Sequence, residues 1–491
     1  MDTDTAQSQK TLDTGLSPGI SRQRAYITFS IVSLALIMSQ INGTIVTVGL
    51  PAITENLQTN LAYAGWVITG YQFSYCITMP IVGRLSDEWG RKRIFLIAVI
   101  VFSLSAVACG FAPNIYYLII FRIIQGIGGG AFMPSATGIV SDIFIKRRAT
   151  ALGLFTSAFS IGGIIGPNIG GILIDQFSWR WIFLVSVPIG IVLILGVILI
   201  LPKGSTATGP KRRIDMLGAG LFSAAILSIT YGMTDWADHL EGIRVITWVL
   251  FAAAVVFLIL FVRHENRTEQ PMIDLTLLRR RPFLAANVYN FVYGAAIIGL
   301  FSFVPYYAQI TYNMTATESG LLLTPRSVAL IIASILTSFF ILRLRYRLPM
   351  ILGLVIISAG FILISRGYRG LNILGFEFQN LVLLTLIVFI TGVGAGISNP
   401  AANNAMIDMF PEKAAAIAGI RGMFRVMGGV IATPVIVLVL SRFKDEGLGF
   451  QQLSLYFAVL LILLIPIVFL VPEMARDKGQ NRAAQAEKTR D

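Results

Sequence analysis

The chain has 491 residues, of which 55% are apolar and only 13% are charged, and its mean hydropathy is +0.77. Roughly a quarter of the residues of an average soluble domain are charged, so this chain has too few charges to cover a surface that faces water. A surface that faces lipid explains the shortage. The net charge of +13 would suggest nucleic acid as the partner of a soluble protein. Here the basic residues stand in short breaks between apolar runs, which indicates orientation in a membrane and no nucleic-acid partner.

The two ends of the chain are polar. Residues 1–25 contain no apolar core, so they are not a cleavable signal peptide, and we expect a cytoplasmic tail there and a second one at 473–491. Cys76 and Cys109 both lie in apolar segments, so we expect neither a disulfide framework nor a metal site.

Long apolar runs fill the chain between the tails. A membrane-spanning helix needs about 20 mostly apolar residues. Fourteen runs of this kind are found, at 26–50, 62–83, 93–112, 114–140, 149–174, 181–201, 215–233, 245–263, 283–309, 317–341, 349–366, 381–403, 413–440 and 452–471.

Lysine and arginine gather in alternate breaks between these runs, and such breaks face the cytoplasm. We therefore expect a multi-pass protein of the plasma (inner) membrane with both termini in the cytoplasm. The opposite breaks hold few basic residues, with Arg366, Arg369, Arg442 and Lys444 as the main exceptions. The basic breaks contain Arg84, Arg91, Lys92 and Arg93; Lys146, Arg147 and Arg148; Lys203, Lys211, Arg212 and Arg213; Arg263, Arg267, Arg279, Arg280 and Arg281; and Arg343, Arg345 and Arg347.

The spans divide into groups of six, two and six, because the two longest charged connections bracket the seventh and eighth spans. This pattern predicts an all-α membrane protein of the kind built from repeated six-helix halves, as in many transporters. The inserted pair would then lie outside the core bundle. The expected parts are an N-terminal six-helix bundle at 26–202, a linker with two additional transmembrane helices at 203–282, and a C-terminal six-helix bundle at 283–472.

The stretch GRLSDEWGRKR joins the second and third spans. Its glycines permit a tight turn, and Arg91 can pair with an acid on a neighbouring helix, for which Asp142 is the natural candidate. The spacing of Gly83, Asp87, Gly90 and Arg91 resembles the signature loop of the major facilitator superfamily. The resemblance implies a latch that favours the outward-facing state. The alternative is an ordinary charged loop that sets the topology.

The fourth span contains LIIFRIIQGIGGGAFMPS, in which Arg122 and Gln125 resemble a second motif of this superfamily. An arginine inside a span is costly unless it finds a partner or water, so Arg122 is a functional candidate by default. The cluster from Gly126 to Gly130 could be mistaken for a dinucleotide-binding loop. No strand precedes it, and close packing of helices is the favoured interpretation.

The fifth span contains SIGGIIGPNIGG, which resembles the motif of antiporters in this superfamily. Small residues four apart let two backbones touch, and a proline supplies a bend where two helices can slide. The alternative is a packing seam with no bearing on the direction of exchange. The motif residues are Gly162, Gly166, Pro167, Gly170 and Gly171.

With WVITGY, SWRWIFLVSVPIG and SGLLLTPRSV, nearly the whole chain resembles the fourteen-span drug:proton antiporter branch of the superfamily. The resemblance implies the major facilitator fold and a monomeric secondary active multidrug-type exporter. Its substrates would be small amphipathic compounds, carried across the lipid bilayer by alternating access.

The first span contains INGTIVTVGLP, and this branch normally has aspartate where this chain has Asn42. An asparagine hydrogen-bonds but cannot carry a proton through a transport cycle. Because the middle thirds of the spans contain no Asp or Glu, a proton gradient as the driving force is in question. The sequence is compatible with a native asparagine and with an engineered replacement of the acid.

The thirteenth span carries Arg421 and Arg425 on one helix face, and Arg326 lies in the tenth. One interpretation is a cavity with a neutral or positive interior that accepts anionic or zwitterionic amphiphiles, including lipids. The other is that the span-thirteen arginines lie near the cytoplasmic face and snorkel or pair with Asp408. Further candidates for the substrate cavity are Gln72, Asn290, Tyr306 and Asn399.

Two hypotheses on transport follow. The first is a multidrug-type exporter. The second is either an exporter of lipids or of anionic or zwitterionic amphiphiles, or a facilitator that is uncoupled from protons. An enzyme is not expected, because the spans contain neither clustered acids nor a His or Cys ligand set. No Walker phosphate loop is present, and we expect no cofactor.

Overall fold

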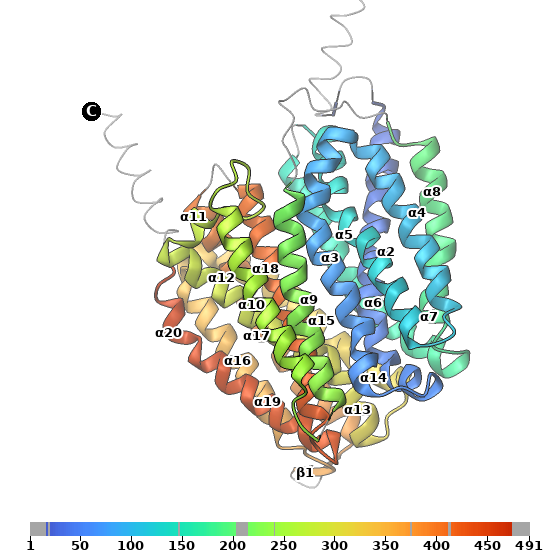
Figure 1. Ribbon diagram of the computed structural model, residues 1–491, viewed down its shortest axis with the longest axis vertical. Helices are drawn as coiled ribbons and strands as arrows, with labels where there is room; N and C mark the ends of the chain where they lie inside the picture. The colour runs from blue at the N-terminus through green and yellow to red at the C-terminus, as the bar shows by residue number, and fades with distance from the viewer. Residues whose placement is uncertain are drawn as a thin grey trace, which may run out of the picture. The chain divides into compact units, whose positions relative to one another are not determined.

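The structure is a computed structural model, and it describes residues 16–17, 20–145, 148–202, 215–239, 241–373, 376–410 and 414–473. Helices form where the sequence predicts each apolar run (Figure 1). The helices of the first half are α2 (Arg22–Asn56), α3 (Leu61–Trp89), α4 (Arg91–Gly110), α5 (Ile115–Ile143), α6 (Arg148–Gln176), α7 (Trp181–Leu184) and α8 (Ser186–Leu199). The next are α9 (Met216–Asp238), α10 (Val245–Glu265) and α11 (Leu275–Leu278). The second half contains α12 (Arg281–Gly294), the π-helical η1 (Ala295–Gly299), the 3-10 helix η2 (Leu300–Phe303), α13 (Val304–Tyr312), α14 (Ala316–Leu321), α15 (Leu323–Leu344), α16 (Arg347–Ser365), α17 (Asn380–Met409), α18 (Ala414–Leu440), α19 (Glu446–Leu463) and α20 (Ile465–Val468).

Polar side chains begin several of these helices, because the first N–H groups of a helix lack partners within it. Asn60 accepts a hydrogen bond from the backbone of Tyr63 at the start of α3, and Asn114 caps α5 in the same way. Thr315 and Glu318 form a capping box at the start of α14. These caps mark where the chain turns back into an apolar run.

Twelve helical segments of the described residues are long enough and apolar enough to cross a membrane. The helices α3 and α6, at the positions expected for the second and fifth spans, are not among them. Both carry many glycine, serine or tyrosine residues. An α-helical membrane protein is thus observed, whereas the count of fourteen spans stays a prediction.

The chain divides into two compact units, Met1–Ser223 and Ala224–Asp491. The boundary falls inside α9 and so inside the expected insertion. Within the first unit, α2 packs on α6, α3 packs on α5, and α4 packs on both α5 and α8. Within the second unit, α12 packs on α18, α15 packs on α17, and α16 packs on both α17 and α19. When α7–α8, α12–α13 and α14–α15 are each counted as one span and the count in the second unit starts at α12, the first helix of each set of six meets the fifth, the second meets the fourth, and the third meets the fourth and the sixth.

Glycines on the fourth helix of each unit show that this repeat extends to single residues. A Cβ atom at Gly126 would lie 2.4 Å from the carbonyl oxygen of Tyr71, and one at Gly130 would lie 2.5 Å from that of Tyr75. In the second unit the corresponding glycines meet the helix α15, with Gly392 at 2.3 Å from the carbonyl oxygen of Arg326 and Gly396 at 2.5 Å from that of Leu330. Gly126 to Gly130 is therefore a packing surface, as the sequence favoured.

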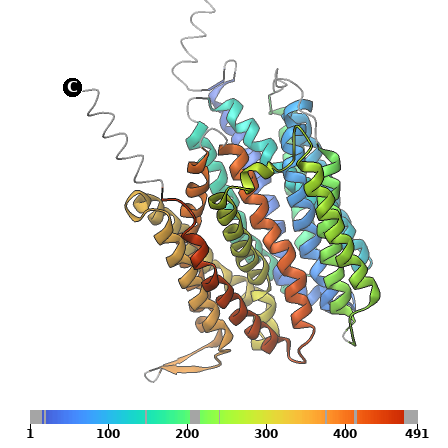
Figure 2. The same ribbon diagram turned by 60° about the vertical axis from the view of Figure 1, so that its left-hand side comes forward.

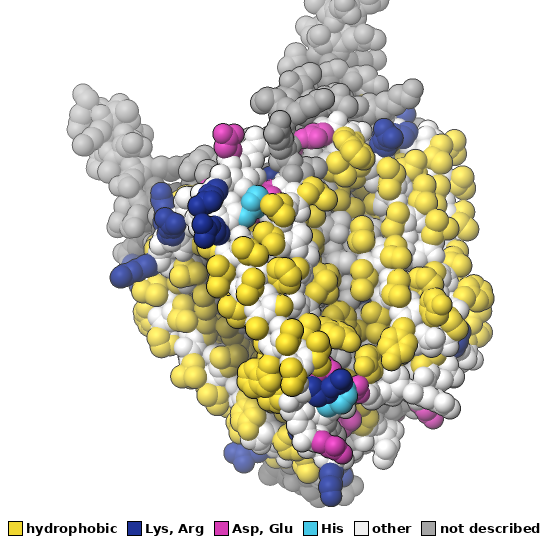
Figure 3. Space-filling model, viewed as in Figure 1, with side chains coloured by type: hydrophobic (Ala, Val, Ile, Leu, Met, Phe, Trp, Pro, Cys, Tyr) yellow, Lys and Arg dark blue, Asp and Glu magenta, His cyan; other side chains and the backbone are white. Residues whose placement is uncertain are grey.

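The pair α9 and α10 exposes apolar side chains along its length. Only 17% of the most apolar stretch of α10 is buried, compared with 72% for the span Arg281–Tyr312. On the face drawn in Figure 3, charged side chains gather toward the ends of the helices, and apolar side chains cover the stretch between. An apolar surface of this kind indicates contact with lipid.

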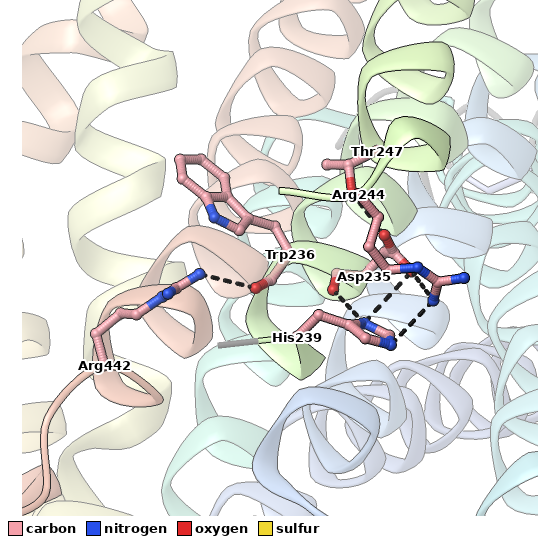
Figure 4. Close-up of polar contacts among 6 residues, drawn as sticks. All are labelled: Asp235, Trp236, His239, Arg244, Thr247 and Arg442. Atoms are coloured by element: carbon pink, nitrogen blue, oxygen red, sulfur yellow. Dashed lines mark hydrogen bonds and ion pairs between the residues drawn. The ribbon is translucent and has the colours of Figure 1, made fainter. Parts of the chain in front are cut away.

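A polar cluster holds the turn between α9 and α10 (Figure 4). Asp235 accepts hydrogen bonds from Arg244, at 3.3 Å, and from Thr247. The ring of His239 lies 2.9 Å from Arg244, and Arg442 donates to the carbonyl oxygen of Trp236 at 3.0 Å. The last contact fastens this turn to the end of α18 within the second unit.

One strand pair is an exception to the all-α expectation. The strands β1 (Leu371–Ile373) and β2 (Phe376–Phe378) pair antiparallel, with Asn372 opposite Glu377. The hairpin projects beyond the helices of its unit (Figure 2). Its signal in the sequence is the alternation of apolar and polar residues in LNILGFEF, a period of two that is typical of a strand.

The antiporter-type motif forms a seam in which three glycines of α6 face α2. A Cβ atom at Gly162 would lie 2.6 Å from the carbonyl oxygen of Ile37, and one at Gly170 would lie 2.5 Å from Ile45. Between them, a Cβ atom at Gly166 would lie 3.0 Å from the carbonyl oxygen of Ile41 and 2.2 Å from Thr44 Oγ1. Glycines at every fourth position thus match residues at every fourth position of α2, and Pro167 lies inside α6 beside them.

We predict that Gly166→Ala lowers the stability of the purified protein, because the added methyl group would force α6 away from α2. Overpacking of this kind typically costs about 1–3 kcal/mol. The matched control is Gly163→Ala, where the added Cβ atom would lie at an ordinary 3.6 Å from its nearest neighbour, Gln40. Thermal unfolding in detergent should show a lower midpoint for Gly166→Ala only. If both variants had the same unfolding midpoint, the close contact between α6 and α2 at Gly166 would be wrong.

Candidate functional site

Asn42 lies at the centre of a buried polar cluster in the first unit. Its side chain is fully buried on α2. The amide nitrogen donates to the carbonyl oxygen of Met38 at 3.2 Å and to the hydroxyl of Ser186, which begins α8. The amide oxygen accepts from Gln125 Nε2 of α5 at 3.1 Å. Asn42 therefore joins three helices through neutral groups.

Arg122 forms the charged side of the same cluster, one helical turn before Gln125. Its Nη1 donates to Gln125 Oε1 at 2.8 Å and its Nε to the carbonyl oxygen of Val67 at 2.9 Å. Its Nη2 donates to the backbone oxygen of Asn42 at 3.3 Å. The guanidinium carbon lies 4.2 Å from the centre of the Tyr71 ring, a cation–π contact.

Neutral oxygens thus meet the hydrogen-bonding needs of a buried cation. Tyr71 in turn donates to the carbonyl oxygen of Ser39 at 3.0 Å. Among the described residues, the ion pairs do not include Arg122. The cluster can hold the helices in register and can bind polar groups, but its residues offer no carboxylate that could accept a proton.

The latch residues are brought together as the sequence predicted. Arg91 Nη2 lies 2.9 Å from Asp87, and Nη1 of the same guanidinium forms an ion pair with Asp142 at the end of α5. Nη1 also donates to the carbonyl oxygen of Gly138 at 2.7 Å. Gly90 has a φ of 93°, a conformation that favours glycine, and this turns the chain between α3 and α4.

Gly138 is a participant that the sequence reasoning missed. A Cβ atom there would lie 2.5 Å from Arg91 Nε. Lys92, the residue after Arg91, donates to the carbonyl oxygens of Ile198 at 3.1 Å and Leu201 at 2.7 Å, at the C-terminal end of α8. The turn is therefore tied to both α5 and α8, and cations at a helix C-terminus are stabilising.

The second unit repeats this arrangement with different chemistry. Tyr346 occupies the place of Arg91, and its hydroxyl donates to Asp408 at 2.7 Å. Burial and this hydrogen bond raise the pKa of Tyr346, so the hydroxyl remains protonated and able to donate. Arg347 donates to the carbonyl oxygen of Val471 at 2.8 Å, as Lys92 does at the end of α8.

The sequence contains a signal for this repeat. Asp142 stands eight residues after Pro134 in the fourth helix, and Asp408 stands eight residues after Pro400. Arg345 takes the place of Gly90 and adopts a φ of 59°, and its guanidinium forms an ion pair with Glu473 at 2.6 Å.

A second polar cluster, which we call the arginine cluster, consists of Arg421 and Arg425 of α18 and Asn399 of α17. Asn399 Oδ1 accepts from Arg421 Nη2 at 2.6 Å and from Arg425 Nη1 at 3.2 Å. All three residues are half-buried. Two cations therefore share one neutral acceptor.

Three other candidates do not join either cluster through the hydrogen bonds of the described residues. Asn290 donates to the carbonyl oxygen of Ala286 at 2.7 Å and to Met406 Sδ. Tyr306 donates to Glu446 at the start of α19. The side-chain oxygen of Gln72 is buried without a hydrogen-bond partner in the described part of the chain.

The sequence profile of the Major Facilitator Superfamily matches this chain over residues 32–433, with a second match over 288–490. The first match covers well over half of the chain. The chain therefore belongs to the major facilitator superfamily, which indicates a membrane transporter rather than an enzyme.

Curated relatives align over most of the chain. The Multidrug transporter protein MdtP of Bacillus subtilis (strain 168) is 29% identical over 83% of this chain and 74% of its own length. The Multidrug resistance protein 3 of the same strain is 32% identical over 74% of this chain and 69% of its own length. The Multidrug resistance protein Stp of Mycobacterium tuberculosis (strain CDC 1551 / Oshkosh) is 30% identical, over 86% of this chain and 77% of its own length.

Solved structures share the fold. A bacterial homolog to the human lysosomal transporter Spinster, in an inward-facing and unoccupied conformation, superposes with a TM-score of 0.67 at 16% identity, over 94% of this chain and 99% of that chain. The nucleoside transporter NupG superposes with a TM-score of 0.66 at 12% identity, over 90% of this chain and 99% of that chain. At these identities the likeness concerns the fold alone.

We predict that Asn42→Leu, which keeps the branched shape and the number of non-hydrogen atoms, destabilises the first unit. Gln125 Nε2 would lose its acceptor and Ser186 its donor, and an unpaired buried polar group costs about 1–3 kcal/mol. The control is Thr54→Ala on the same helix, because Thr54 donates only within α2, to the carbonyl oxygen of Leu50 at 2.8 Å. Thermal unfolding should show the larger loss for Asn42→Leu, and equal losses would contradict the role of the cluster.

Proposed function

We propose that this protein is a secondary active exporter of amphipathic compounds of the multidrug type that works by alternating access. The observation that carries the proposal is the similarity, over most of the chain, to relatives named as multidrug transporter and multidrug resistance proteins. We further propose a fourteen-span member of the drug antiporter branch, monomeric in the plasma (inner) membrane, with both termini in the cytoplasm. The alternate basic breaks support this orientation.

We propose that position 42 carries no proton during transport. Asn42 has no titratable group, and its amide is engaged with Gln125, Ser186 and its own helix. The positive charge of Arg122 is met by neutral oxygens, so the cluster works without a carboxylate. The cluster would then act as a fixed polar joint between helices.

A second candidate function is favoured by the arginine cluster, namely the export of lipids or other anionic or zwitterionic amphiphiles. Arg421 and Arg425 put two positive charges into one helix of the second unit. Positive charges of this kind disfavour organic cations and favour anions.

Transport by proteoliposomes tests the function. We expect the protein to move a fluorescent amphipathic dye. We expect the Asn42→Asp variant to move the dye faster when a pH gradient is imposed, and to take up protons as it does so. The reason is that a carboxylate at position 42 can bind and release a proton whereas the amide cannot. No dye movement by either form would overturn the exporter proposal. The same gradient dependence in both forms would overturn the assignment to position 42.

We propose that the ion pair between Arg91 and Asp142 acts as a latch that favours the outward-facing state. The pair is partly exposed, with 23% of the Arg91 side chain and 46% of the Asp142 side chain accessible. An exposed ion pair contributes at most about 1 kcal/mol. Its loss should therefore shift the balance of conformations only several-fold.

Cysteine labelling tests the latch. The reporter is Ser86→Cys, since Ser86 is buried near the end of α3, in a background with Cys76 and Cys109 replaced by serine. We expect Asp142→Asn to raise the labelling rate roughly two- to fivefold, in line with about 0.5–1 kcal/mol. The control is Arg93→Gln, which removes an exposed charge from the same turn. If the two variants are labelled equally fast, the ion pair between Arg91 and Asp142 is not a latch and only helps to set the topology.

A further inference from the structure

The arginines of the two units differ in how their hydrogen-bonding needs are met. Arg122 uses all three of its guanidinium nitrogens, on Val67, Gln125 and Asn42. In the second unit, by contrast, the Nε atoms of Arg326, Arg421 and Arg425 are buried and have no hydrogen-bond partner among the described residues. Unpaired buried donors on cations are costly, so this arrangement requires an explanation. A ligand that accepts these hydrogen bonds would supply one.

We propose that Arg421, Arg425 and Asn399 form a binding site for the anionic oxygen group of an amphipathic molecule, a carboxylate or a phosphate. The inference rests on the proposed transport of amphipathic compounds and names the charge of their polar end. Asn399 Oδ1 already draws the two guanidinium groups together, at 2.6 Å and 3.2 Å. Guanidinium groups match the planar or tetrahedral oxygens of such anions in geometry as well as in charge.

The contacts of the arginines argue against simple snorkelling, because both guanidinium groups donate to Asn399 of the neighbouring helix α17. Along α18, at 1.5 Å per residue, Arg421 stands about 10.5 Å and Arg425 about 16.5 Å from the first residue, Ala414. The ion pairs of the described residues do not join either arginine to Asp408, whose Oδ2 accepts from Tyr346 at 2.7 Å. The pairing with Asp408 that the sequence left open is therefore not observed.

Buried aromatic rings lie against the arginines and help to hold them in place. Arg425 lies over the ring of Tyr293, at 5.1 Å from its centre, and Tyr293 stacks on Tyr289 at 5.9 Å. Arg326 lies over Phe301 at 3.9 Å. Tyr293 and Phe301 stand on either side of the π-helical turn η1, an irregularity that is frequent at functional sites.

The three arginines present cations within one unit. Arg326, Arg421 and Arg425 are each half-buried, so a part of every side chain remains accessible to a ligand. A molecule with one anionic end fits this charge, whereas an organic cation would be repelled by three positive charges.

Binding to the purified full-length protein in a neutral detergent tests the site. The probes are pyrenebutyrate and its uncharged methyl ester, and the readout is the fluorescence anisotropy of pyrene. We expect the anion to bind at least about tenfold more tightly than the ester, because the two differ only in the charged group. The preference should be lost in the double variant Arg421→Gln/Arg425→Gln.

Two controls separate loss of the site from loss of folding. The double variant Arg366→Gln/Arg369→Gln removes two exposed arginines of the same unit and should keep the preference. The double variant Arg421→Lys/Arg425→Lys keeps both charges and should keep part of it. If Arg421→Gln/Arg425→Gln binds the anion as well as the unaltered protein does, or if the unaltered protein shows no preference, the site is wrong.

The source of the anion is distinguished by competition. The binding of pyrenebutyrate is compared between protein in nanodiscs of phosphatidylcholine alone and protein in nanodiscs that also contain phosphatidylglycerol. Displacement of pyrenebutyrate by phosphatidylglycerol would support the site with a lipid phosphate as its occupant, and no displacement would support it with a soluble carboxylate or phosphate. The binding assay does not measure transport. If the protein prefers the anion in this assay but moves no dye in proteoliposomes, the proposed exporter function is wrong and the proposed binding site stands.

Discussion

A guanidinium group inside a membrane-spanning helix must find hydrogen-bond acceptors, because lipid offers none. The first unit meets this constraint with neutral oxygens, which lie on three different helices, α2, α3 and α5. Asn42 is essential to the arrangement, since it offers its backbone oxygen to Arg122 and its side-chain oxygen to Gln125. The helices α2, α3, α5 and α8 are thereby fixed around one cation. An aspartate at position 42 would add a negative charge that the present hydrogen bonds do not require.

The glycine seam and the polar cluster act on different faces of α2. Gly162, Gly166 and Gly170 allow α6 to touch the backbone of α2, while the amide of Asn42 is held by α5 and α8. Close contact of backbones is nondirectional and permits sliding, whereas hydrogen bonds fix a register. Movement of α6 along α2 would therefore leave the cluster undisturbed.

The sequence predicted the helices and the pairing of Arg91 with Asp142. Apolar runs of sufficient length specify the spans, Arg91 belongs to a motif of fixed spacing, and Asp142 is an acid at the end of a neighbouring span. The partners of Arg122 and Asn42 could not be predicted, since Val67 and Ser186 become neighbours of these residues only when four helices pack. The hairpin β1–β2 was missed although LNILGFEF alternates, because a search for long apolar runs passes over so short a segment.

The two units use one helical plan for different electrostatics. In the first unit an ion pair fastens the turn between the second and third helices, and the buried arginine is fully hydrogen-bonded. In the second unit a tyrosine replaces the arginine of the turn, and among the described residues the buried Nε atoms of Arg326, Arg421 and Arg425 have no hydrogen-bond partner. A repeated fold needs the same backbone contacts twice, and the glycines of α5 and α17 provide them. Those contacts leave the polar side chains free to diverge, so the first unit is built as a rigid joint and the second as the unit that has donors to offer to a ligand.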